Sequence, residues 1–159
     1  ADTSFLIAIQ KMQLFDEVHS LYHEVYITRK IAEEFQLTLP DWIFIHEPKN
    51  VHVQSVLSFI IDAGEASAIA LAYDYQDVIL IIDDLKATKE AVRLGFNITG
   101  TLGVLIKLKK EGLIISIEQK IFQLKEIGFR ISPKIIEEIL KIVGENYYYK
   151  KVGGKRINK

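Results

Sequence analysis

Acidic residues that follow apolar segments are the side chains of this sequence whose type and spacing could do chemistry. Asp83 and Asp84 come directly after five consecutive aliphatic residues, 78–82. Two adjacent acids at the wall of an apolar core repel each other, and a bound cation would relieve that repulsion. Because carboxylate oxygens favour hard cations, the pair indicates a site for a divalent metal ion.

Other acids hold comparable positions. Asp2 precedes a predicted helix, and Glu65 begins another, next to Gly64. Glu33 and Glu34 lie inside a helix that follows an apolar strand. Simpler explanations exist for each of them. Asp2 could be an ordinary N-cap, the Glu33–Glu34 pair a solvated helix face, and Glu65 a favourable charge at a helix N-terminus. The sequence alone leaves these alternatives open.

Alternating strands and helices are predicted to position these acids. In an open α/β sheet the ligand site lies beyond the carboxyl ends of the strands, where several of the acids fall. The wholly apolar run 78–82 is typical of a parallel strand that is covered on both faces. We expect strands over 25–27, 42–46, 78–82 and 96–98, and helices over 4–12, 14–22, 28–35, 51–61, 65–75, 85–94, 101–112, 117–127 and 133–143.

Length and composition predict a single soluble domain. The chain has 159 residues and no cysteine, which excludes disulfides, thiolate zinc sites and a cysteine nucleophile, and is compatible with a cytoplasmic location. Every apolar run is broken well before the roughly 18 residues of a membrane span, so no membrane association is expected. We expect one domain over 1–144 and a basic, flexible tail over 145–159.

Charge is divided unevenly along the chain. Residues 1–85 hold 4 basic and 14 acidic residues, whereas residues 86–159 hold 16 basic and 7 acidic ones. A nuclease could use such a division, because metal ions need concentrated acids and a phosphate backbone needs a basic surface. A basic tail is the simpler explanation, since five of the positive charges lie within 150–159.

Taken in order, the motifs that carry these acids resemble the PIN-like nucleases, in particular an uncharacterised bacterial and archaeal branch of that superfamily. The resemblance covers about residues 1–130, and no single motif is diagnostic by itself. The motifs are Asp2-Thr3-Ser4, Ile31-Ala32-Glu33-Glu34-Phe35, Gly64-Glu65-Ala66, Ile82-Asp83-Asp84 and Thr99-Gly100-Thr101-Leu102-Gly103.

The resemblance implies a three-layer α/β/α sandwich with a mostly parallel central sheet and a pocket of carboxylates that holds Mg²⁺ or Mn²⁺. Carried over by position, Asp2, Glu34, Glu65 and Asp84 would be the catalytic acids. Glu34, directly before Phe35, fits the family's acidic position on the second helix better than Glu33 does. Asp2, Glu65 and Asp84 would ligate the metal, and Asp83, their close neighbour, is a further candidate metal ligand whose role relative to Asp84 is not assigned.

Two threonines lie in the last of these motifs. Thr99 and Thr101 flank Gly100 at a helix start, where they could bind a water or a phosphate, although a capping role is the simpler one.

The sequence departs from the family pattern around Asp2. Phe5 stands where the family has proline. The apolar strand that the family places before Asp2 does not precede it here, and without such a strand the first ligand would be weakly anchored.

The leading hypothesis is a metal-dependent endoribonuclease that acts on RNA. The resemblance adds a toxin role, an antitoxin partner and a homodimer. One alternative is a non-catalytic PIN-like module that binds RNA or protein. Another is a phosphoacceptor domain, which ranks last because it would need a lysine at the end of a late strand, and 98–100 offers none.

Several other residue patterns have simpler explanations. His19 and His23 have a spacing that could bind a metal, but without a third ligand they are better explained as surface histidines. Trp42 is expected in the core. The run Tyr147–Tyr149 beside Lys150 and Lys151 could stack on bases, and a dimer contact or a loose tail explains it equally well.

Overall fold

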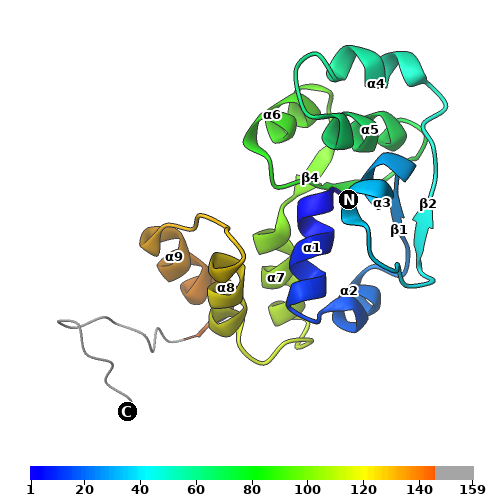
Figure 1. Cartoon of the computed structure of the whole chain (residues 1–159). Coiled ribbons are helices and arrows are strands. Elements are labelled where there is room, and N and C mark those ends of the chain that lie inside the picture. The colour runs from blue at the N-terminus through cyan, green and yellow to red at the C-terminus, as the bar shows by residue number, and fades with distance from the viewer. Residues whose placement is uncertain (146–159) are drawn as a thin grey trace. The chain divides into compact units, whose positions relative to one another are not determined.

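Residues 1–145 are described by the structure, a computed structural model in which they form two compact units, 1–104 and 105–145. Figure 1 labels most of their elements. The first unit contains α1 (Thr3–Lys11), α2 (Phe15–Leu21), β1 (Val25–Ile27), α3 (Arg29–Phe35), β2 (Ile43–Ile45), α4 (Val51–Leu57), α5 (Ala63–Ala72), β3 (Ile79–Ile81), α6 (Leu85–Arg93), β4 (Asn97–Thr99) and the start of α7 (Thr101–Lys110). The second contains the rest of α7, α8 (Ile117–Glu126) and α9 (Pro133–Val143).

The predicted order of strands and helices is confirmed, with differences at the ends of elements. The largest concerns α4, which ends at Leu57 although the apolar pattern runs on to Ile61. Ser58 is its C-cap, and Asp62 already stands at the N-cap position of α5. The pattern continues because Leu57 and Ile61 are both buried, so the apolar spacing records burial rather than helix length.

The strands pair in parallel, as predicted. Val25 of β1 pairs with Ile43 of β2, and Ile79 of β3 pairs with Asn97 of β4. The predicted single central sheet of a three-layer sandwich is not confirmed, because residues 1–145 form two separate two-stranded sheets. The first two residues connect them through their backbone: Ala1 N donates to Tyr26 O at 3.1 Å, and Asp2 N donates to Ile81 O at 2.9 Å.

Small side chains make α5 the central helix of the first unit. All its residues from Ala66 to Ala72 are buried, because alanine and serine let the neighbouring backbones approach closely. Figure 1 shows α4 lying along α5, and α3 and β3 also contact α5. This packing fixes the start of α5, where Glu65 lies, relative to α3, which carries Glu34.

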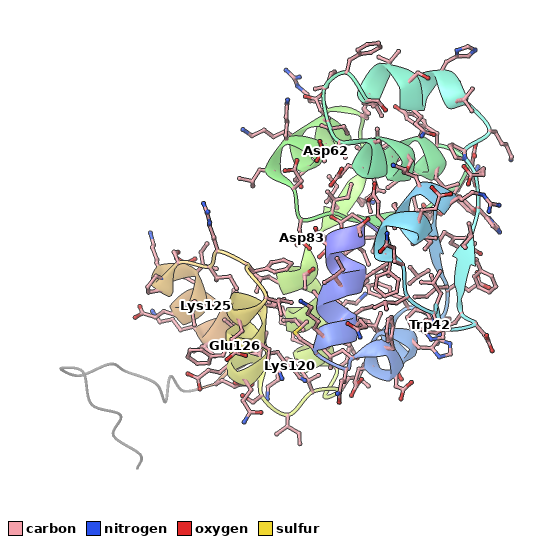
Figure 2. All side chains as sticks on the ribbon, viewed as in Figure 1. Trp42, Asp62, Asp83, Lys120, Lys125 and Glu126 are labelled. Carbon is pink, nitrogen blue, oxygen red and sulfur yellow. The ribbon has the colours of Figure 1, made fainter. Side chains whose placement is uncertain are left out.

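The ring of Trp42 anchors α2 at the start of β2. Its ring meets Phe15 edge-on at 6.2 Å between centroids and stacks on His19 at 5.0 Å. Figure 2 shows Trp42 beside α2. His19 therefore has a packing role, which fits its interpretation as a surface histidine rather than a metal ligand.

A carboxylate from the end of the described chain caps α8 in the second unit. Glu145 Oε1 accepts a hydrogen bond from Ile117 N at 2.8 Å and lies 2.9 Å from Lys109 Nζ. Ser132 caps α9 by accepting from Ile135 N at 3.3 Å, with Pro133 in the first turn as predicted. The apolar faces of α8 and α9 supply buried side chains, among them Ile121, Leu124, Ile136 and Leu140.

Within residues 1–145, no helix has both the length and the apolar character that a bilayer crossing requires. The predicted flexible tail lies outside the described residues except for Glu145, and so does the tyrosine run 147–149.

Candidate carboxylate site

Asp2 joins the start of α1 to the end of β3. Its Oδ1 accepts a hydrogen bond from Phe5 N at 2.8 Å, so Asp2 is the N-cap of α1. Its Oδ2 accepts from Asp83 N at 2.9 Å. The residue is only 1% exposed. Burial raises the pKa of Asp2 to about 6, although the two backbone hydrogen bonds act in the opposite direction and the nearby Asp83 raises it further.

Asp83 links β3 to the start of α7. Its Oδ1 accepts from Thr101 N at 2.7 Å, and its Oδ2 accepts from the Thr101 hydroxyl at 2.5 Å. Burial raises the pKa of Asp83, and the two bonds from Thr101 lower it in part. Figure 2 shows Asp83 beside the N-terminal end of α1. Asp2 and Asp83 thus form an inner pair whose oxygens are engaged by the protein itself.

Glu34 comes from α3 and faces α1 and α5. Its Oε2 accepts from the Thr3 hydroxyl at 2.7 Å, and its Oε1 lies 3.7 Å from Lys30 Nζ. A Cβ placed on Gly64 would come within 2.8 Å of Glu34 Oε2, so the Glu34 carboxylate reaches its position only because residue 64 has no side chain. Its neighbour Glu33 lies exposed on the same helix.

Glu65 lies in the first turn of α5, where its charge also suits the helix dipole. Burial raises the pKa of Glu65, and the negative charges of Asp62, Asp84 and Glu34 raise it further. These acids therefore lie near enough to repel one another, although they come from different helices and from different parts of the chain.

Asp84 is the N-cap of α6. Its Oδ1 accepts from Lys86 N at 2.9 Å and from Ala87 N at 2.8 Å. Both bonds use the same oxygen, so the hydrogen bonds of Asp84 within residues 1–145 leave its Oδ2 available to another partner. The adjacent acids thus differ in environment: Asp83 is bonded on both oxygens, whereas Asp84 is exposed and bonded on one.

The structure brings the predicted residues together in two groups. Asp2 and Asp83 form the inner pair, and an outer group consists of Glu34, Glu65 and Asp84. In residues 1–145, however, no three aspartate, glutamate or histidine side chains come close enough to form a preformed metal-binding group. The acids of the outer group act on one another through their negative charges, as the raised pKa of Glu65 shows.

Thr99 and Thr101, the predicted substrate-binding residues, have different surroundings. Thr101 is fully buried and bonded to Asp83, so its hydroxyl supports the inner pair rather than a free helix cap. The Thr99 hydroxyl donates to Gly100 O at 3.3 Å and lies against Gly103, where an added Cβ would collide with it. The closest partners of Thr99 therefore belong to its own motif.

Sequence reasoning missed the supporting contacts of the outer group. Thr3 and Lys30 both bind Glu34, and Asp62 adds to the negative charge around Glu65. The spacing of Lys30 and Glu34 along one helix was a usable signal, because residues four apart share a helix face. The bond from Thr3 spans 31 positions and has no such local signal.

Comparison with known proteins gives a match over all of the described residues. A family model described as a PIN domain matches residues 1–145. No curated protein and no solved structure matches. The matched range contains both the inner pair and the outer group.

Proposed function

Because the chain belongs to the PIN domain family, whose members are generally nucleases, we propose that it is a metal-dependent endoribonuclease that hydrolyses RNA phosphodiesters. The observation that carries the proposal is the outer group, in which burial raises the pKa of Glu65 and the negative charges of Asp62, Asp84 and Glu34 raise it further. Repulsion of this kind costs folding free energy, and a divalent cation would remove that cost.

The donor set fits Mg²⁺ or Mn²⁺. Its members are carboxylates, which suit hard cations that bind a few oxygens and keep several waters. Asp84 and Glu65 would hold the ion, and Glu34 would join them on releasing Lys30. When bound, the ion would supply a more acidic water and charge stabilisation for the attacking and leaving oxygens.

The residues of the chain would divide the remaining tasks. Asp2 and Asp83 would fix the end of β3, so that Asp84 projects from the start of α6 at a constant position. Thr99 and Thr101, beside Gly100, would lie near the substrate phosphate, with Thr101 acting through Asp83. Partial burial would keep the pKa of Glu65 raised until the cation binds.

A cleavage assay with a matched variant tests this proposal. Purified protein is incubated with single-stranded and hairpin RNA in Mn²⁺, Mg²⁺ or EDTA. Asn caps helices as well as Asp, so Asp84→Asn should keep α6 folded while cleavage falls by about a hundredfold or more. Asp41→Asn, an exposed acid before β2, is the control and should cut as the parent does. Equal cutting by Asp84→Asn and the parent would contradict the proposal.

A non-catalytic RNA- or protein-binding module is the second candidate. It is favoured by Glu34, whose two oxygens already contact Thr3 and Lys30. Metal titration separates the two functions, because a ligand that binds the folded state raises its melting temperature. The nuclease should show a Mn²⁺-dependent rise that Asp84→Asn abolishes, and the binding module should show none.

From the family we further propose that the protein is the toxin of a toxin–antitoxin pair and that it forms a homodimer. If the protein is a toxin, expression of the parent chain should slow bacterial growth, and Asp84→Asn should relieve that effect. Size-exclusion chromatography with light scattering would measure the mass of the assembly.

A further inference from the structure

Among the helices that lie wholly in the first unit, α6 carries the most positive charge. Its nine residues include Lys86, Lys89 and Arg93 and only one acid. Residues 1–85, by contrast, hold 4 basic and 14 acidic residues. An acidic stretch of the chain is thus followed by a basic helix, and that helix begins directly after Asp84, its N-cap.

The three basic residues form one row on the exposed side of α6. Positions 86, 89 and 93 are three and four residues apart, so they share a helix face, and all three are exposed. Ala87 and Ala91 are fully buried on the other side, where α6 lies against β4 and α5 (Figure 1). At 1.5 Å per residue, the row extends along solvent for about 10 Å.

The stability of the helix does not account for this row. A positive charge in the first turn opposes the helix dipole, and Lys86 is the second residue of α6. Arg93 lies in the last turn, where it pairs with Glu90 at 3.1 Å. Lys86 and Lys89 form no ion pair with any of the residues that the structure describes. Their two charges are therefore exposed and not neutralised by a neighbouring carboxylate.

Two large apolar side chains flank the row. Leu85 and Val92 are 77% and 61% exposed, and because they are seven residues apart they lie on one side of α6. Leucine contacts the faces of bases in several nucleic-acid-binding proteins, and basic side chains contact the phosphates. The exposed surface of α6 therefore offers both kinds of contact side by side.

We propose that this surface, the α6 track (Leu85, Lys86, Lys89, Val92 and Arg93), binds a single strand of RNA that extends from the carboxylates along α6. The basic residues contact successive phosphates, and the two apolar residues contact bases. Those bases are unpaired, because pairing in a duplex hides their faces. The cleavage of this strand rests on the proposed function, whereas its binding to the track needs no metal ion.

Binding measured in EDTA tests the track. A labelled oligouridine strand is titrated with the full chain at several KCl concentrations, and fluorescence anisotropy gives the affinity. Each phosphate contact to a single strand contributes about 0.7 to the slope of log affinity against log salt concentration. For Lys86→Gln/Lys89→Gln/Arg93→Gln, we expect a slope smaller by about 2 and an affinity at low salt that is lower by about tenfold or more.

Two further variants separate the contributions. Lys11→Gln/Lys125→Gln/Lys134→Gln removes the same charge from exposed positions elsewhere and should bind nearly as the parent does. Leu85→Ala/Val92→Ala should lower the affinity by about threefold or more and leave the slope unchanged, because apolar contacts release no counterions. All variants should keep the parent's melting temperature, since exposed ion pairs add little stability.

Several results would overturn the proposal. One is an equal slope for the parent and the variant of the three basic residues. Another is an equal loss in the charge-matched control, because binding would then follow net charge alone. A polyglutamate peptide that binds more tightly than oligouridine would show that the track fits an acidic protein instead. Failure of the proposed cleavage is detected separately, as equal cutting by Asp84→Asn and the parent, and does not alter these slopes.

Discussion

Asp2 accepts a hydrogen bond on each carboxylate oxygen, and so does Asp83, whereas both bonds to Asp84 use a single oxygen. The carboxylates at or beside the end of β3 thus have two different roles. Fully bonded acids hold the ends of elements together. Acids with an available oxygen can still bind something else.

Stability in the absence of metal should fall as pH rises from about 4 to about 7. The folded state raises the pKa of Asp2 from 3.8 to about 6, so it binds the proton more tightly than the unfolded chain does. This contribution is present in full below the unfolded pKa and is lost as pH rises through about 6, for a total of up to about 3 kcal/mol. Urea unfolding in EDTA at several pH values measures it.

The Asp2→Asn variant supplies the control, because its side chain does not titrate. Its unfolding free energy should vary less with pH than that of the parent, and Asp83 and Glu65, whose pKa values are also raised, account for the remainder. A parent protein that gains stability between pH 4 and pH 7 in EDTA would show that the burial of Asp2 has been misjudged.

Thr101 should contribute to stability through its hydroxyl. Thr101→Val keeps the shape of the side chain but leaves Asp83 Oδ2 without its donor, which should cost about 1–3 kcal/mol. Thr101→Ser keeps the hydroxyl and should cost less. Chemical denaturation of both variants at pH 7 measures the difference, and equal stabilities would argue against this bond.

The contact between α3 and α5 sets the position of Glu34. Gly64→Ala would place a Cβ 2.8 Å from Glu34 Oε2 in the present geometry, so the flexible carboxylate must turn away. We expect folding to be retained, because alanine favours a helix. Metal-dependent cleavage should fall by about 10–100-fold, as for other residues that position a ligand.

A double-mutant cycle isolates this effect. In a Glu34→Ala background there is no carboxylate to displace, so Gly64→Ala should leave the remaining cleavage rate unchanged. If Gly64→Ala has the same effect with and without Glu34, the alanine acts through α5 itself and not through the carboxylate.

The cap of α8 by Glu145 should stabilise the second unit independently of the metal site. Although burial raises the pKa of Glu145, hydrogen bonds from Lys109, Ile117 and Glu118 lower it overall. A lowered pKa gives stability that is lost as pH falls through the folded value. Glu145→Gln should therefore speed amide exchange at Ile117 and Glu118 at pH 7, with exposed Glu111→Gln as the unaffected control.

At the scale of the whole molecule, local rules predicted which segments form helices and strands. The five aliphatic residues before Asp83 predicted β3, and the Ser132–Pro133 pair predicted the start of α9. Local rules could not predict how the strands join, because sheet order depends on pairing between distant segments. One such feature is that β1 and β3 lie in separate sheets. The early end of α4 was not predicted either, because the buried Ile61 continues the periodic apolar pattern beyond the end of the helix.

The sequence also predicted which acids lie near one another, but not how each is used. Asp2 was both a possible ligand and a possible N-cap, and the structure shows the cap directly. Asp83 and Asp84 were indistinguishable in the sequence, since only the bonds from Thr101 to Asp83 separate their environments. Such contacts span 18 positions and leave no local pattern.

The proposed function requires that Glu34, Glu65 and Asp84 bind a divalent cation that promotes cleavage of RNA. The most direct measurement is the anomalous scattering of Mn²⁺ in crystals soaked at a concentration that supports cleavage in solution. We expect a manganese peak about 2.1 Å from oxygens of Asp84 and Glu65, and no such peak in Asp84→Asn crystals. If the protein cuts RNA with Mn²⁺ while its only manganese peak lies away from these carboxylates, they do not form the metal site.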